Sequence, residues 1–327
     1  MELVIANHSY YPRIGDTEEQ HKLRKAYHLF DRKKIDQERL QKVQKETISD
    51  IIREQESSQL DVVTDGLILW NDPVSHLLRK VEGVEIKGLL RFFDTNFYFR
   101  QPVIHGKLQR VSSLLKEEAS FLKKVTKKKT KVVLTGPWTL ALLSKCETPL
   151  YKNREEIADA LALILEEEIK ELSSLGVDYI QIDEPGYLFV EPDWDWASQT
   201  LKNLAKHKGK AQIGLMTYFG DAKPLYAKLQ KLPVDFLGLD CTYSPKLVDH
   251  IKKEGSDKDL SLGLLDGRNT KLEDPKEVGK ILKSLSSLKG KTVYLTTSCG
   301  LEYLPRNRAL DKLKILKAIK DGFKKGV

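Results

Sequence analysis

The chain has 327 residues, of which 40% are hydrophobic, and its 55 Lys and Arg against 47 Asp and Glu give a net charge of +8. No stretch approaches the roughly 18 uninterrupted apolar residues of a membrane span, which excludes a helical membrane protein. The N-terminal sequence MELVIANHSYYPRIG lacks the basic and apolar regions of a signal peptide, so we expect a cytoplasmic protein.

The positive charge is densest in the segment KKVTKKKTK at 123–131, which has neither interleaved aromatic residues nor a glycine-rich RNA-binding signature. We therefore interpret the lysines as solvated helix faces and expect no nucleic-acid partner. Cys146, Cys241 and Cys299 are scattered and form no CxxC pair, so we expect reduced thiols.

Short apolar runs, typical of buried strands, recur along the chain and are separated by longer segments with helical periodicity. The runs lie at 3–7, 61–65, 131–136, 178–185, 212–218, 235–240, 260–267 and 292–298. Apolar strands that alternate with helices form a parallel sheet covered on both faces, and this number of repeats favours closure. We predict a single (β/α)8 TIM barrel over 1–327, with an open doubly wound sheet as the alternative.

Two of the connecting segments are informative. The segment 153–176 predicts a helix, with Asn153 as its N-cap and Gly176 at its end. The segment 66–130 is too long for one crossover, and it contains GLLRFFDTNFYFRQPVIHG, whose alternation predicts a hairpin. We predict an insertion over the barrel mouth between the second and third strands. Its aromatic residues would form the core of this lid, or stack on a flat pterin.

Polar residues follow the predicted strands where they end, and catalytic groups of such barrels lie at these carboxyl ends. They are Asn7, His8, Thr64, Asp65, Thr135, Asp183, Glu184, Thr217, Tyr218, Asp240, Cys241, Asp266, Arg268, Ser298 and Cys299. Single Asp, Ser and Thr residues at strand ends also serve as caps. Their presence at all the ends together predicts a functional site at the mouth.

Several motifs resemble the cobalamin-independent methionine synthases, a family of enzymes with two related barrels. The motifs are NHSYYPRIG with HKLRKA, FFDTNFYFRQPV, LTGPWTLALLSK, YIQIDEP, TYFGD, LSLGLLDGRN and TSCGLEYLP. They cover nearly the whole chain and are most similar to the N-terminal, zinc-free barrel. The resemblance implies transfer of a methyl group from a folate to homocysteine, with zinc holding the thiol as a thiolate in the catalytic barrel.

The resemblance also shows which zinc ligands are missing. Aligned by sequence, Leu215 and Thr217 stand at the family's His-x-Cys pair, and Arg268 stands where the catalytic barrel has a histidine. Asp240 takes the place of a ligating glutamate, and Cys299 alone matches outright. Because a catalytic zinc site needs three protein ligands, we expect no bound zinc, with Asp240 and Cys299 as the residual candidates. Whether Cys241, His8 or His105 rebuilds a site in another geometry is left open.

The same comparison suggests site residues. The family uses the Asp of its IDEP motif to contact the amino group of the substrate, which makes Asp183, with Glu184, the first catalytic candidates. Asp240 and Cys299 are the others, and bracing of loops by Asp183 and Glu184 is the alternative role. Arg13, His21, Arg24 and Lys25, in the stretch that the family places near the folate tail, are predicted to bind substrate carboxylates. Ser298 and Arg268 complete the predicted substrate-binding residues.

Three functions remain open at this point. The first is a methyltransferase that acts on a folate or a related donor and a homocysteine-like thiol. The second is a non-catalytic, folate-binding subunit that works with a separate zinc-bearing barrel. The third is a decarboxylase of the uroporphyrinogen type, which would need Arg13, Arg100 and Arg268 to form one basic cleft.

Overall fold

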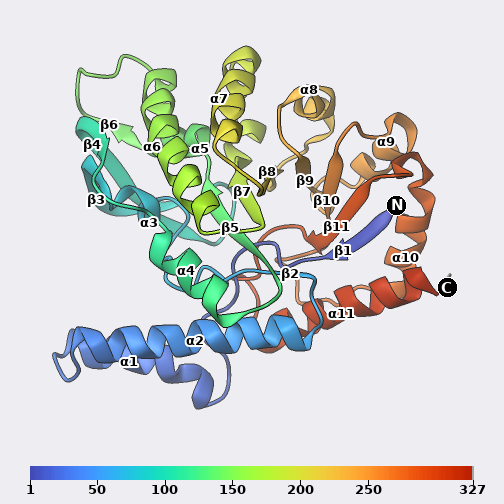
Figure 1. Cartoon of the computed structure of the whole chain (residues 1–327), viewed down its shortest axis with the longest axis horizontal. Coiled ribbons are helices and arrows are strands. Elements are labelled where there is room, and N and C mark those ends of the chain that lie inside the picture. Colours follow the sequence, from blue (N-terminus) through green and yellow to red (C-terminus); the bar gives the residue numbers. More distant parts are fainter. Residues whose placement is uncertain (326–327) are drawn as a thin grey trace.

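The computed structural model describes residues 1–325 and confirms the barrel. The strands pair in parallel in the order β1-β11-β10-β9-β8-β7-β5-β2 (Figure 1). A bridge between Ala6 and Val62 closes the ring. This closure excludes the open sheet. The strands are β1 (Glu2–Ile5), β2 (Val62–Val63), β5 (Lys129–Thr135), β7 (Tyr179–Asp183), β8 (Gln212–Thr217), β9 (Phe236–Asp240), β10 (Asp259–Leu265) and β11 (Thr292–Thr297).

Helices cover the outside of the barrel. They are α1 (Lys22–Asp31), α2 (Gln37–Ser57), α4 (Lys116–Val125), α5 (Pro137–Leu143), α6 (Arg154–Ser174), α7 (Trp194–Lys206), α8 (Tyr226–Lys231), α9 (Lys246–Glu254), α10 (Pro275–Ser284) and α11 (Arg306–Lys324). The predicted caps of α6 are confirmed, since the Asn153 side chain accepts a hydrogen bond from the Glu156 amide and Gly176 has a φ of 71°. Within residues 1–325, no helix combines the length and the apolar character that a bilayer span requires.

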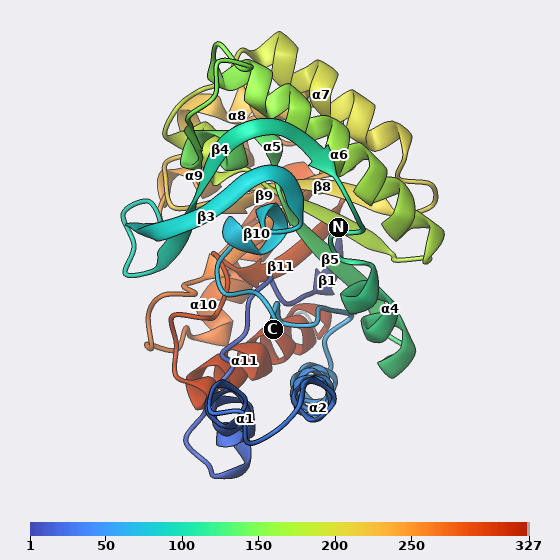
Figure 2. The same ribbon diagram turned by 90° about the vertical axis from the view of Figure 1, so that its left-hand side faces the viewer.

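The predicted insertion is a long antiparallel hairpin of β3 (Val81–Arg91) and β4 (Tyr98–Arg110), preceded by the short helix α3 (Ser75–Leu78). The short strand β6 (Lys145–Cys146) extends it to three strands. Figure 2 shows β3 and β4 arching across the barrel. Trp70, Phe92 and Phe99 are buried, so these rings belong to the core of the lid.

Aromatic contacts join the tip of the hairpin to loops at the carboxyl ends of the strands. Phe93 stacks on Phe189 with ring centroids 4.3 Å apart. Phe92 meets Phe219 at 6.1 Å, and Phe97 meets Tyr303 at 6.0 Å. The hairpin therefore lies over the mouth, as predicted.

The base of the hairpin is fixed by a buried carboxylate of α6. Glu168 accepts hydrogen bonds from the amides of Leu114 and Leu115, each at 2.7 Å, and from Arg110 Nη2 at 2.8 Å. Paired in this way, the carboxylate satisfies both the guanidinium and the backbone after β4. The hairpin is anchored at its base by charged and backbone hydrogen bonds, and ring contacts join its tip to the loops.

The lower half of the barrel interior is filled by aromatic side chains. The rings of Tyr179, Phe236 and Tyr294 contact one another, with Phe236 and Tyr294 at 5.1 Å. A Cβ at Gly214 would lie 2.1 Å from the Phe236 ring, so this glycine makes room for it. Because the lower interior is packed, only the upper end can hold a ligand.

The contact between the ends of β10 and β11 can be tested with two glycines. A Cβ at Gly263 would lie 2.5 Å from Ser298 Cα, whereas a Cβ at Gly279, inside α10, meets nothing within 4 Å. We expect Gly263→Ala to lower the free energy of unfolding by about 1–3 kcal/mol. Gly279→Ala should raise it by about 0.5–1 kcal/mol, because alanine is the better helix former. Urea denaturation measures both, and equal stability of the two variants would contradict this packing.

Candidate functional site

Asp183 ends β7 and points into the barrel mouth. Its carboxylate accepts hydrogen bonds from Gln181 Nε2 at 2.8 Å and from the Tyr218 hydroxyl at 3.0 Å. Burial raises the pKa of Asp183 to about 7, against the effect of these two hydrogen bonds and of Lys131 nearby. A carboxyl in this setting changes charge near neutral pH, and it can receive a cationic group from a ligand.

Glu184, the next residue, points the other way, as expected for neighbours at a strand end. Its carboxylate accepts hydrogen bonds from the amides of Trp138 and Thr139, at 2.9 and 2.8 Å, and from the Thr139 hydroxyl. These amides open α5, so Glu184 satisfies the free N–H groups of that helix. Burial raises the pKa of Glu184 to about 8, and the hydrogen bonds oppose this. The geometry gives Glu184 a bracing role.

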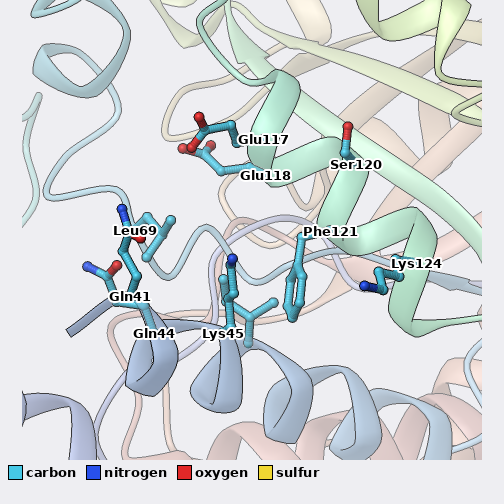
Figure 3. Close-up of a pocket in the computed structure, with 10 residues that line it drawn as sticks. Gln41, Gln44, Lys45, Leu69, Glu117, Glu118, Ser120, Phe121 and Lys124 are labelled. Carbon is cyan, nitrogen blue, oxygen red and sulfur yellow. The ribbon is translucent and has the colours of Figure 1, made fainter. Parts of the chain in front are cut away.

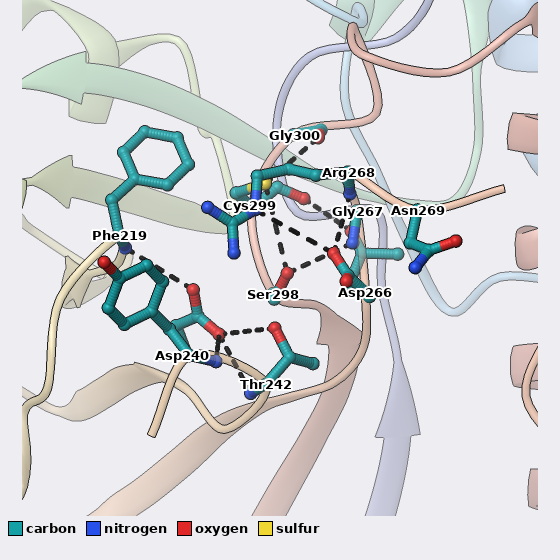
Figure 4. Close-up of polar contacts among 12 residues, drawn as sticks. Phe219, Asp240, Thr242, Asp266, Gly267, Arg268, Asn269, Ser298, Cys299 and Gly300 are labelled. Atoms are coloured by element: carbon teal, nitrogen blue, oxygen red, sulfur yellow. Dashed lines mark hydrogen bonds and ion pairs between the residues drawn. The ribbon is translucent and has the colours of Figure 1, made fainter. Parts of the chain in front are cut away.

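Asp240 and Arg268 form part of the rim (Figure 4). Asp240 accepts hydrogen bonds from the amides of Thr242 and Tyr243, both at 2.9 Å, and from the Phe219 amide at 3.4 Å. Burial raises the pKa of Asp240, and Arg268 opposes this rise. The Arg268 guanidinium lies over the rings of Phe219 and Tyr243, at 5.6 and 5.3 Å. Arg268 is therefore held in place by cation–π contacts and by an ion pair of its Nε with Asp266 Oδ1 at 3.9 Å, and its Nη groups make no hydrogen bond within residues 1–325.

Ser298 and Cys299 join the same rim from the end of β11. Ser298 Oγ accepts a hydrogen bond from the Gly267 amide at 3.1 Å, and Cys299 Sγ lies 3.4 Å from the Gly300 carbonyl oxygen. Burial raises the pKa of the Cys299 thiol, so the sulfur is protonated at neutral pH. The structure thus brings together four predicted residues: Asp240, Arg268, Ser298 and Cys299.

The strand register corrects the sequence alignment at the expected zinc site. Met216 pairs with Asp183, and its sulfur packs against Gly238 on the inner face. Leu215 and Thr217 therefore face the helices, because a shift of one residue along a strand changes the face. The interior counterparts of the His-x-Cys pair are Met216 and Tyr218. Neither methionine nor tyrosine is a usual zinc ligand, so these two positions supply no zinc donors.

The remaining donors do not compensate. Both oxygens of Asp240 already accept hydrogen bonds, and Cys299 is a buried thiol. In the described part of the chain, no group of three or more His, Cys, Asp and Glu side chains has the arrangement of a metal site. Cys146, Cys241 and Cys299 are all free cysteines. The residues present do not fit zinc.

The predicted folate-binding residues do not gather at the mouth. Lys25 forms an ion pair with Glu18 on the exposed face of α1, and Arg24 is exposed beside it. His21 lies at the start of α1 and is partly buried. In both views α1 lies at the edge of the molecule, packed on α2 (Figures 1 and 2). Arg13 alone is near the mouth, 3.5 Å from Asn71 Oδ1 and within electrostatic range of Glu302.

Several mouth residues were not predicted from the sequence. The Tyr10 and Tyr303 hydroxyls, Gln181 Oε1 and Glu302 Oε2 are buried and have no hydrogen-bond partner among residues 1–325. All four residues lie on β7 or in the loops after β1 and β11. Buried polar atoms without partners are rare, and they point to a ligand or water. Glu302 follows the recognised Cys-Gly-Leu motif directly, which was the available signal.

Lys131 was also not predicted, and His8 was named only as a polar strand-end residue and as an open metal candidate. Lys131 pairs in register with Tyr179, so it shares the inner face with Asp183 four residues further along β7. Burial lowers the pKa of Lys131 to about 7, and Asp183 opposes this. Burial, with Lys131 adding to it, holds the pKa of His8 well below its usual value. Lys131 therefore contributes to the charge balance beneath the mouth, whereas His8 stays neutral at neutral pH.

A groove of about 490 Å³ lies away from these residues, between α2 and α4 (Figure 3). Its floor is apolar, formed by Ile48, Leu69 and Phe121, and its rim is mixed in charge, with Lys45 and Glu117 among its residues. Most of these residues come from helices rather than from the strand ends. The groove is therefore separate from the mouth.

The arginines required by a decarboxylase do not meet. Arg100 is exposed on β4, and Arg268 lies between Phe219 and Tyr243. Across the described residues, no contact joins Arg13, Arg100 and Arg268. The structure gives no support to this third function.

Comparison with known proteins gives one consistent result. Residues 79–290 match the family model described as the cobalamin-independent synthase, N-terminal domain. A methionine synthase of Sulfolobus acidocaldarius is 31% identical over 296 residues, which cover 89% of this chain and 85% of that protein. A B12-independent methionine synthase from a Shewanella species, solved in complex with selenomethionine, has a TM-score of 0.81 at 23% identity and covers 100% of this chain and 99% of its own. A methyltransferase from Methanosarcina mazei has a TM-score of 0.62 at 14% identity and covers 86% of each chain.

The bracing role of Glu184 makes a prediction about stability. Glu184→Ala leaves the amides of Trp138 and Thr139 buried without an acceptor, so the free energy of unfolding should fall by about 2–4 kcal/mol. Glu184→Gln keeps one acceptor oxygen and should lose less. Glu277, exposed on α10, offers a matched control in Glu277→Ala, which should change stability little. Thermal or urea unfolding tests this, and an unchanged stability with a loss of ligand binding would instead place Glu184 in the site.

Proposed function

Since this chain belongs to the cobalamin-independent methionine synthase family, where its match is to the N-terminal domain, we propose that it transfers a methyl group to a thiol. The acceptor is homocysteine or a closely related thiol. The donor is a methylated folate or a related compound. Both substrates are small molecules that meet under the hairpin at the barrel mouth.

The observation that carries the proposal is the set of buried, unpartnered polar atoms beside Asp183. Gln181 Oε1 can only accept hydrogen bonds, so a ligand there must bring a donor. The ammonium group of an amino acid supplies three. Asp183 would hold this group by a charge-assisted hydrogen bond. The Shewanella relative was solved with selenomethionine, which is an amino acid of this kind.

Arg268, Ser298 and Arg13 suit the anionic parts of the substrates. The Nη groups of Arg268 lie at the rim without a hydrogen-bond partner among residues 1–325, and Arg13 lies within electrostatic range of Glu302. A guanidinium binds a carboxylate with two parallel hydrogen bonds. The reacting end of the substrates would lie between Asp240 and Cys299. His21, Arg24 and Lys25 on α1 would reach only the distal carboxylates of a long folate tail.

A second function is favoured by the lack of zinc donors at Met216 and Tyr218. In this case the chain is a non-catalytic, folate-binding subunit, and a separate homologous barrel supplies zinc. The two functions differ in what a single purified protein does. Only the first gives turnover without a partner.

Turnover by the purified protein tests the proposal. We expect methionine to form from homocysteine and methyl-tetrahydrofolate, as followed by mass spectrometry, with elemental analysis of the same sample. Activity that appears only after addition of a zinc-bearing homologue pulled down from cell extract would support the second function. If no donor yields methionine with or without such a partner, both functions fail.

Asp183→Asn tests the amino-group contact. The amide has nearly the same shape but no charge, so the KM for homocysteine should rise by about 10- to 100-fold, the size expected for a hydrogen bond to a charged group. Steady-state kinetics measures this, and Glu277→Gln should leave KM unchanged. An unaltered KM in Asp183→Asn would refute the contact.

A further inference from the structure

Glu302 occupies an unusual position in the loop after β11. Its Oε2 atom is buried and has no hydrogen-bond partner in the part of the chain that the structure describes. A Cβ at Gly300 would lie 2.2 Å from this oxygen and 2.8 Å from Tyr10 Cβ. The carboxylate thus turns back beside Cys299 into space that Gly300 leaves open. The Oε2 atom is shielded from solvent although the residue is partly exposed, and its charge is close enough to those of Asp183 and Arg13 to interact with them.

Glu302 differs in this respect from the other carboxylates at the strand ends. Asp183 accepts from Gln181 and Tyr218 through separate oxygens. Asp240 is bound by the amides of its own loop and of Phe219. Glu184 caps α5. Glu302 therefore has the oxygen that is free to take a proton from a ligand.

We propose that Glu302 is the general base that takes the proton of the acceptor thiol, a task that zinc performs elsewhere in the family. This inference rests on the proposed function. It follows from the disagreement between the family's zinc chemistry and the donors present here. A protein that cannot hold the thiolate on a metal needs a base within reach of the S–H group.

The step balances without a further reactant. The S–H bond breaks and its proton moves to Glu302. The sulfur then forms a bond to the methyl carbon while the N–CH3 bond of the folate breaks, and the electron pair stays on that nitrogen. The proton passes from Glu302 to the nitrogen. The carboxylate is regenerated in each cycle.

The surroundings of Glu302 favour transfer of a proton between the thiol and this carboxylate. Burial raises the pKa of Glu302 to about 8, Asp183 adds to the rise and Arg13 opposes it. A free thiol has a pKa of about 8.5, so the proton affinities of acid and base are close. The other groups that feel this charge are Tyr10, Tyr218, Cys299 and Tyr303. Burial raises the pKa of each, so they stay protonated, while the lowered pKa of His8 makes it a weaker base.

Glu302→Gln is the direct test, because the amide keeps the shape and cannot accept the proton. We expect kcat/KM to fall by about 10²- to 10⁴-fold, the usual contribution of a general base. The rise of the wild-type rate toward about pH 8, where Glu302 ionises, should disappear. Glu302→Asp should keep part of the rate and its pH dependence. Glu277→Gln is the control, and unfolding curves show whether each variant is folded.

A second donor separates this inference from the proposed function. Methyl iodide methylates homocysteine without any folate site, so the protein at stoichiometric concentration should accelerate methionine formation and Glu302→Gln should not. If the protein accelerates methylation by methyl iodide but not by methyl-tetrahydrofolate, Glu302 keeps its role as the base and the folate donor is refuted. The inference is overturned if methyl iodide gives no acceleration, or if Glu302→Gln raises KM and keeps the pH dependence. It is also overturned if a chelator abolishes activity or if His8→Gln, rather than Glu302→Gln, removes the pH dependence.

Discussion

The burial of ionisable groups at the carboxyl ends of the strands determines the character of this protein. Asp183, Glu302 and Lys131 all have pKa values shifted toward neutrality by desolvation. Such groups are costly to place in a folded interior, and they are kept where a ligand or a reaction uses their charge. The charges of Lys131 and Glu302 both interact with that of Asp183. The site therefore depends on a closed barrel and a hairpin that together exclude water.

Much of the fold could be predicted from local pattern. The apolar runs fixed the strands, because buried parallel strands are apolar on both faces. The alternation around Phe92 and Phe97 predicted the hairpin. The site was harder to predict, because the role of a residue at a strand end depends on the face to which its side chain points. The adjacent Asp183 and Glu184 take different roles because they point to opposite faces, and Leu215 was assigned to a face that Met216 occupies.

The positions of other residues could not be predicted by comparison of motifs. Glu302 lies within the motif TSCGLEYLP, but its importance comes from the loop conformation that buries Oε2. Lys131 would be expected to reach solvent, because a lysine at the start of a strand is usually exposed. In the closed barrel its side chain lies on the inner face instead. Arg24 and Lys25 lie exposed on the outer helix α1, so a substrate that contacts them must extend outward from the mouth.

The contrast between the two ends of the hairpin has a kinetic consequence. Its base is tied to Glu168 by charged and backbone hydrogen bonds, whereas its tip is held by the rings of Phe93 and Phe189. Both Phe93 and Phe219 have positive φ angles, of 50° and 71°, which are strained for aromatic residues. The hairpin tip lies over the site, so any substrate that enters past it depends on the movement of these rings. If such a movement is needed for entry, its rate limits turnover however fast the chemical step is.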